Sequence, residues 1–142
     1  MLFSKRERLI RRILVVEDEP LVAFDNEYLL TDAGYEVVAT VDSLAAAGEV
    51  IGREPLDLVL TDIKLAGEGD GTGVARLAGE RSIPVLFVTG QPCDHVRTLG
   101  LGCLAKPYSE KVLKNALEAI DRHLRGERLK KLPAQLTLYE AA

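Results

Sequence analysis

The sequence predicts one α/β domain built on a doubly wound parallel sheet. Short apolar runs alternate along the chain with segments of helical periodicity. Within these runs, apolar and polar residues do not alternate, so the strands are expected to be buried on both faces, as in a parallel sheet covered by helices. Short connections and right-handed crossovers favour the doubly wound arrangement, in which functional groups gather at the carboxyl ends of the strands.

Five strands are expected from the apolar runs, at Ile13–Val16, Glu36–Thr40, Asp57–Thr61, Pro84–Thr89 and Gly102–Ala105. Helices are expected at Leu21–Ala33, from Leu44 to Ile51, around Val74–Ala78 and after Ser109. Pro20 suits the first turn of the first helix, and Gly34 closes it. Asp42 or Ser43 can cap the second helix, and Ser109 the last, which Gly126 stops.

The connection between the fourth and fifth strands is short. Gly90 to Gly102 has to hold the whole crossover, with Pro92 and Gly100 inside it. At about 3.6 residues per turn, this leaves about two turns of helix at most. We therefore predict a short or irregular fourth helix.

Length and composition are those of one globular domain. The chain has 142 residues, of which 47% are hydrophobic and 28% charged. No apolar run approaches the roughly 18 residues that a membrane span needs. The basic segment from Met1 to Arg12 lacks the apolar stretch of a secretory signal. We expect a cytoplasmic protein with no membrane partner.

Charge is distributed unevenly along the chain. Residues 1–12 hold five basic residues and one acidic residue, a net charge of +4. Because the whole chain carries −4, the remaining residues together carry −8. An acidic body argues against DNA as a partner. We divide the chain into a basic extension at 1–11, a domain at 12–126 and a tail at 127–142. The extension is either a solvated helical segment or a contact for an acidic partner.

The two cysteines, Cys93 and Cys103, give no disulfide framework and no CxxC pair. Asp94 and His95 beside Cys93 are metal-ligand types. A zinc site needs about four well-placed ligands, however, so these residues are weak evidence for one.

Polar residues at the strand ends fit one reaction. Glu17 and Asp18 follow the first strand, Asp62 the third and Lys106 the fifth, and Thr89 ends the fourth. A parallel sheet brings these positions to one edge. Clustered carboxylates suit Mg²⁺, and a carboxylate beside the metal can be the nucleophile toward a phosphoryl group. A lysine and a hydroxyl then stabilise the transferring oxygens.

Four motifs carry a resemblance to a known family. They are Val-Val-Glu-Asp-Glu-Pro at 15–20, Leu-Thr-Asp-Ile at 60–63, Val-Thr-Gly at 88–90 and Ala-Lys-Pro-Tyr at 105–108. In this order they resemble the receiver domains of two-component response regulators, from about Arg12 to Gly126. The resemblance implies a flavodoxin-like or CheY-like fold with strand order 2-1-3-4-5.

The same resemblance implies a role for each strand-end residue. Asp62 would be the phosphoacceptor. Asp18 would bind Mg²⁺ directly and Glu17 through water, and the carbonyl of Lys64 would supply a backbone ligand. Thr89 at the end of the fourth strand and Lys106 after the fifth would contact the phosphoryl oxygens.

The donor implied by the resemblance is a phosphohistidine on a histidine kinase or histidine phosphotransfer protein. The chain would be a single-domain response regulator that acts as phosphorelay intermediate, phosphate sink or partner-binding switch. It would be a signalling protein, and the only reactions it would catalyse are its own phosphorylation and dephosphorylation. Its contacts with partners are expected near Pro20–Phe24 and the loop after strand five, where Leu21 and Phe24 are either exposed contacts or core.

The chain departs from the family pattern in three ways. Where the family carries an aromatic switch, three residues before the strand-five lysine, this chain has Cys103, and Tyr108 is the only nearby aromatic candidate. The fourth crossover is unusually short. The run Val-Leu-Phe-Val-Thr-Gly at 85–90 partly resembles a single-domain subgroup named for Phe-Ala-Thr-Gly. Lys64 and Gln91 either gate the hydrolytic water or are simply exposed.

Other readings stay open. A haloacid-dehalogenase-like phosphohydrolase usually has an acid-base aspartate two residues after its nucleophile, where this chain has Lys64. A phosphorylation-independent scaffold conflicts with the complete polar set but fits the missing aromatic. Gly67–Gly73 matches no nucleotide-loop motif and reads as a flexible loop. The tail either packs on the domain, self-associates, binds a partner or frays.

Overall fold

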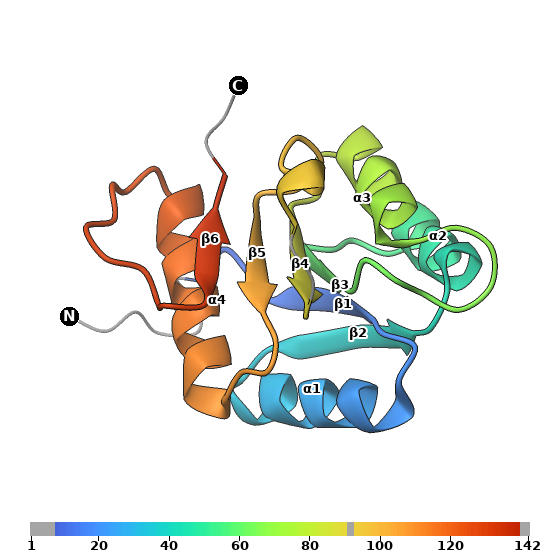
Figure 1. The fold of residues 1–142 in the computed structure, drawn as a ribbon, viewed down its shortest axis with the longest axis horizontal. Helices are drawn as coiled ribbons and strands as arrows, with labels where there is room; N and C mark the ends of the chain where they lie inside the picture. Colours follow the sequence, from blue (N-terminus) through green and yellow to red (C-terminus); the bar gives the residue numbers. More distant parts are fainter. Residues whose placement is uncertain (1–7, 91–92, 140–142) are drawn as a thin grey trace.

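The computed structural model describes residues 8–90 and 93–139, which form a six-stranded sheet in the order β2-β1-β3-β4-β5-β6 (Figure 1). The first five strands are parallel, and β6 runs antiparallel to β5. The strands span Arg12–Val16 (β1), Glu36–Val41 (β2), Leu58–Thr61 (β3), Val85–Thr89 (β4), Gly102–Ala105 (β5) and Leu136–Leu138 (β6). The expected class and the order of its five strands are confirmed.

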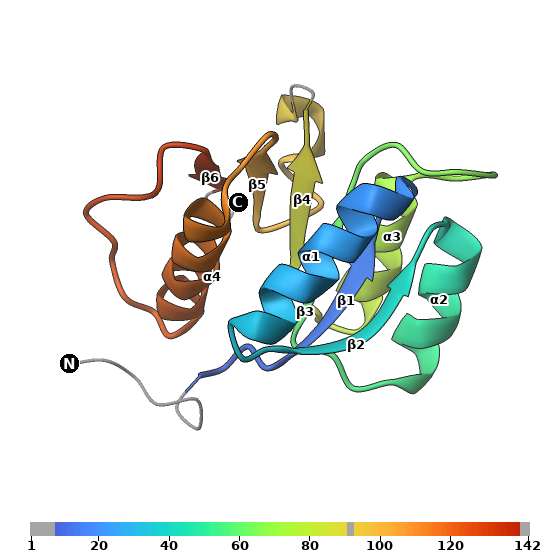
Figure 2. The same cartoon turned by 90° about the horizontal axis from the view of Figure 1, so that it is seen from below.

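Helices cover both faces of this sheet. They span Pro20–Asp32 (α1), Leu44–Arg53 (α2), Gly71–Glu80 (α3) and Glu110–Leu124 (α4). Helices α1 and α4 lie on one face, and α2 and α3 lie on the other (Figures 1 and 2). The third helix is longer than expected, because the glycine-rich loop leads directly into it at Gly71.

The helix ends follow from their local sequence. Ser43 and Ser109 accept hydrogen bonds from the amides of Ala46 and Val112, as expected of N-cap residues. Asp70 caps α3 in the same way, an N-cap that was not predicted from the sequence. Gly34 and Gly126 follow α1 and α4 with positive φ angles of 95° and 88°, a conformation that glycine adopts without steric cost.

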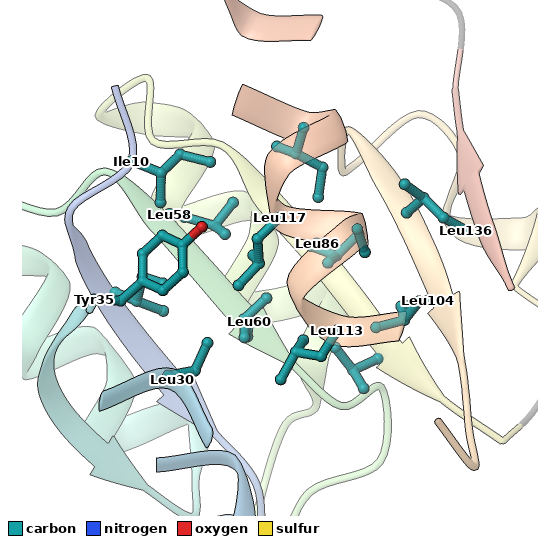
Figure 3. Close-up of a cluster of buried hydrophobic side chains, with 14 of the residues drawn as sticks. Ile10, Leu30, Tyr35, Leu58, Leu60, Leu86, Leu104, Leu113, Leu117 and Leu136 are labelled. Atoms are coloured by element: carbon teal, nitrogen blue, oxygen red, sulfur yellow. The ribbon is translucent and has the colours of Figure 1, made fainter. Parts of the chain in front are cut away.

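The core has two parts, one on each side of the sheet. Under α1 and α4, leucines of adjacent strands meet the inward faces of the helices (Figure 3). The labelled side chains of this cluster include Leu30, Leu58, Leu60, Leu86, Leu104, Leu113 and Leu117. Under α2 and α3, the second cluster includes Val16, Val74, Phe87 and Cys103. Burial on both faces explains the continuous apolar strands.

The fourth crossover contains no α-helix in its described part. A single 3-10 turn, Asp94–Val96, lies between β4 and β5, and only Val96 of this turn is buried. The prediction of a short or irregular fourth helix is therefore confirmed.

The sixth strand corrects the expectation of five. It lies along β5, with Leu104 opposite Leu136 and Gly102 opposite Leu138. A side chain at Gly102 would overlap the carbonyl of Thr137, so glycine permits this close approach. A three-residue strand is too short for its apolar pattern to be recognised against a loop.

Within the described ranges, no helix has the length and apolar character required to span a bilayer.

Candidate functional site

The polar residues at the strand ends meet at the carboxyl edge of the sheet. The amide of Asp62 donates to the carbonyl of Val16, so the residue after β3 lies beside the end of β1. In the same way, the amide of Lys106 donates to the carbonyl of Thr89 and joins the ends of β5 and β4. Parallel register thus collects residues that are far apart in sequence.

Lys106 links two of the predicted carboxylates. Its Nζ lies 2.6 Å from Glu17 Oε1 and 2.9 Å from Asp62 Oδ2. Burial by itself lowers the pKa of Lys106, but the hydrogen bonds to Glu17 and Asp62 together outweigh it and raise the pKa to about 12. A positively charged ammonium therefore lies between the two carboxylates at neutral pH.

The first-strand acids differ in their surroundings. Glu17 is 4% exposed, and its second carboxylate oxygen accepts a hydrogen bond from the amide of Glu19. Asp18 is half-exposed and lines a shallow cleft of about 390 Å³ with Glu17, Thr40 and Asp42. One of the two acids is thus locked by Lys106, while the other faces an accessible cleft.

The backbone around Asp62 is held closely. Its Oδ1 accepts from the amide of Ile63 at 2.7 Å, which leaves Oδ2 for Lys106. Gly71 at the start of α3 donates its amide to the carbonyl of Ile63. A Cβ at Gly71 would overlap the carbonyl oxygen of Asp62, so the glycine lets α3 approach the candidate phosphoacceptor.

The remaining predicted residues take separate positions. Thr89 is buried at the end of β4, joined to Lys106 through the backbone. Lys64 is exposed. Gln91, the second predicted modulator of phosphate lifetime, falls outside the described residues.

The predicted metal ligands fit Mg²⁺ in donor type. Within the described part of the chain, no three His, Cys, Asp or Glu side chains form a metal-binding group. Two of the predicted ligands, Glu17 and Asp62, nevertheless converge on one cation, the ammonium of Lys106. Both ligands are carboxylate oxygens, which are the donors that hard divalent cations such as Mg²⁺ prefer.

Tyr108 is anchored to α1. Its hydroxyl donates to Oδ1 of Asn26, a buried side chain that sequence reasoning missed. Burial raises the pKa of Tyr108 to about 12, although the nearby charge of Lys106 and the hydrogen bond to Asn26 act in the opposite direction. Asn26 lies four positions before Leu30 and so shares the inward face of α1 with it. A polar residue on an inward helical face indicates that a hydrogen-bond partner packs against it.

Cys103 forms a disulfide, which corrects the expectation that the two cysteines give no disulfide framework. It is disulfide-bonded to Cys93, and the described chain contains no other cysteine. The two lie ten residues apart and form none of the usual motifs. Their proximity arises because the connection after β4 returns alongside β5, which spacing alone does not show.

Comparison with known proteins is consistent with this geometry. The family model described as the response regulator receiver domain matches residues 13–118, most of the chain. The chain belongs to the response regulator receiver family. Its position in the phenylalanine-alanine-threonine-glycine subgroup is not established by the comparisons.

Individual relatives agree with this assignment. The sensory transduction protein RegX3 of Mycobacterium tuberculosis is 34% identical over 116 residues, which cover 78% of this chain and 50% of RegX3. A response regulator receiver protein from Sinorhizobium medicae is 32% identical, with a TM-score of 0.69 over 78% of this chain and 94% of that one. The chain spans about half the length of the curated relatives it matches.

Proposed function

We propose that this receiver accepts a phosphoryl group from a phosphohistidine onto Asp62. The observation that carries the proposal is the contact of one lysine, Lys106, with both Glu17 and Asp62 across three strands. A cation held between a buried acid and a partly accessible aspartate is suited to neutralise charge where a phosphoryl group arrives.

The transfer follows from the chemistry of these groups. An oxygen of Asp62 attacks phosphorus, the phosphorus–nitrogen bond to the donor imidazole breaks, and the imidazole takes a proton from solvent. With a pKa of about 12, Lys106 stays protonated throughout and faces the growing negative charge. The hydroxyl of Thr89 serves as a further hydrogen-bond donor to the phosphoryl oxygens. Water later hydrolyses the acyl phosphate.

Mg²⁺ completes the proposed site. Asp18 and Asp62 would hold it through their carboxylates, with Glu17 acting through water and Lys64 through its carbonyl. When bound, the ion supplies charge neutralisation at the phosphoryl oxygens. Asp18 is suited to the direct role, because it is half-exposed and lines the cleft while Glu17 is engaged by Lys106.

A histidine kinase or histidine phosphotransfer protein is the proposed donor, and α1 is its proposed docking surface. Leu21, Phe24 and Tyr28 lie on one face of α1 and are 81%, 68% and 63% exposed. Pro20 begins this helix directly after the acidic cluster, so the apolar stripe adjoins the site. We propose that the protein then acts in the cytoplasm as relay intermediate, phosphate sink or partner-binding switch, without binding DNA.

The exposed side chain two residues after the phosphoacceptor is proposed to set the phosphate's lifetime. Lys64 can shield the acyl phosphate from water, and Gln91 is proposed to orient that water. A Lys64→Ala variant is then expected to lose its phosphate faster than the wild type, measured by intact mass over time.

The decisive experiment is phosphorylation by acetyl phosphate with Mg²⁺, read by intact mass. The wild type and Asp32→Asn, a matched change at the exposed end of α1, are expected to gain one phosphate, and Asp62→Asn none. Labelling of Asp62→Asn would move the acceptor elsewhere. No labelling of any variant, under conditions that label another receiver, would favour a scaffold, whereas sustained turnover of small phosphate esters would favour a phosphohydrolase.

A further inference from the structure

The disulfide joins the connection after β4 to strand β5, at positions close to the functional residues of the candidate site. Cys93 follows Thr89 by four residues, and Cys103 precedes Lys106 by three. Cys103 lies opposite Phe87 on β4, and Thr89 lies opposite Ala105 on β5. The bond therefore ties the connection that leaves Thr89 to the strand that leads to Lys106.

The tied connection has few other restraints. Its described part contains one 3-10 turn and one buried side chain, Val96. Cys93, Leu99 and Leu101 are only partly buried against the two cores. Individual hydrogen bonds add to these contacts, such as the amide of Leu101 to the carbonyl of Val85 and the hydroxyl of Tyr139 to the carbonyl of Cys93. A segment with little buried apolar surface has low local stability, so one covalent bond strongly affects its freedom.

The two sulfur-bearing residues differ in access. Cys103 is 4% exposed within the core under α2 and α3, and Cys93 is only half-buried. Thiol–disulfide exchange begins by attack on the more accessible partner, and Cys93 is the more exposed of the two residues. Disulfides in a reducing compartment are usually transient rather than structural. In the cytoplasm, where we propose that this protein acts, the bond would therefore have a regulatory role.

We propose that Cys93–Cys103 is a reversible redox site that controls the freedom of the connection between β4 and β5, and through it the phosphorylation of Asp62. The second part of this inference rests on the proposed function. In the oxidised form, the bond opposes the adjustment of Thr89 and Gly90 to an arriving phosphoryl group. In the reduced form, the connection is released and phosphorylation is faster.

Hydrogen peroxide is one class of oxidant that can form the bond. The thiolate of Cys93 attacks the peroxide, the oxygen–oxygen bond breaks, and a sulfenic acid and water result. The thiolate of Cys103 then attacks that sulfur, a second water leaves, and two thiols and one peroxide have become one disulfide and two waters. A dithiol restores both thiols by exchange and is itself oxidised to its disulfide.

The redox step is tested without any phosphate chemistry. Folded protein is equilibrated with glutathione buffers of graded ratio, alkylated and weighed intact. Two alkyl groups are expected in reducing buffer and none in oxidising buffer, with full reversal by dithiothreitol. Amide hydrogen exchange of residues 93–101 is expected to rise on reduction. Thiols that never pair, a bond that resists dithiothreitol in the folded protein, or unchanged exchange would each overturn the proposal.

Coupling to the site is tested on the same two forms. Acetyl phosphate with Mg²⁺ is expected to label the reduced wild type about fivefold faster than the oxidised form, about 1 kcal/mol in the barrier. Cys93→Ser, which cannot form the bond, is expected to react in both buffers as fast as the reduced form of the wild type. Equal rates in the two wild-type forms would overturn the coupling. Absence of labelling in every form would overturn the proposed function and with it the coupling, while hydrogen exchange would still decide the redox site.

Discussion

The Nζ atom of Lys106 lies 2.9 Å from Oδ2 of Asp62, although the two residues follow different strands, β5 and β3. Between them runs β4, which carries Thr89 at the same edge. The contact therefore depends on the sheet order rather than on any local sequence feature. The same ammonium also contacts Glu17, the most buried acid of the site, and so links it to Asp62, the proposed phosphoacceptor.

Replacing Lys106 by methionine is expected to destabilise the fold by about 3 kcal/mol, because a buried Glu17 loses its counter-charge. Adding Glu17→Gln is expected to recover much of this loss, since the buried carboxylate is then neutral. Urea denaturation of both single variants and the double variant measures the coupling. Additive effects of the two changes would mean that the pair contributes nothing in solution.

Gly71 and Gly79 form a matched pair on α3. Gly71→Ala is expected to destabilise by about 2 kcal/mol, because its Cβ would overlap the carbonyl of Asp62 and force the backbone to shift. Gly79→Ala has open space around its Cβ and is expected to stabilise by about 0.5–1 kcal/mol through helix propensity. Thermal or urea unfolding measures both, and a Gly71→Ala protein as stable as the wild type would contradict the close packing.

Alkaline pH is expected to weaken the fold through Tyr108 and Lys106. Each has a folded pKa raised to about 12, from ordinary values of 10.0 and 10.5. A raised pKa means that the folded state holds its proton more tightly, so this stability is present below about pH 10 and is lost as the pH rises toward 12. Tyr108→Phe is expected to flatten that decline, measured by urea midpoints across the alkaline range. An unchanged slope would place the loss elsewhere.

Much of the fold and site could be predicted because both depend on patterns that a parallel sheet enforces. Apolar runs such as Ile13–Val16 located strands, and polar residues directly after them, such as Asp62 and Lys106, located the carboxyl edge. The serines at 43 and 109 located helix starts, because their hydroxyls satisfy free amides.

The missed features depend on contacts between distant segments. Strand β6 is only three residues long and exists because it pairs with β5. The Cys93–Cys103 bond requires the path of the connection, and the pairing of Tyr108 with Asn26 requires the packing of the fifth-strand loop on α1. No periodicity reports such contacts, whereas a polar residue on an inward helical face at least signals that a partner exists.

If the donor protein docks on α1, a change on this helix is expected to slow phosphoryl transfer from a protein donor but not from acetyl phosphate. Phe24→Ala removes a ring that is 68% exposed, so its effect on stability is expected to be small. With a phosphorylated histidine phosphotransfer protein selected for transfer to the wild type, we expect about a tenfold slower transfer, the loss of one interface anchor. With acetyl phosphate, the rate is expected to be unchanged, since Asp62 and Lys106 are intact. Leu124→Ala, at the far end of α4, is the control and is expected to leave both rates unaltered. A Phe24→Ala protein that accepts phosphate from the protein donor at the wild-type rate would exclude this stripe as the docking surface.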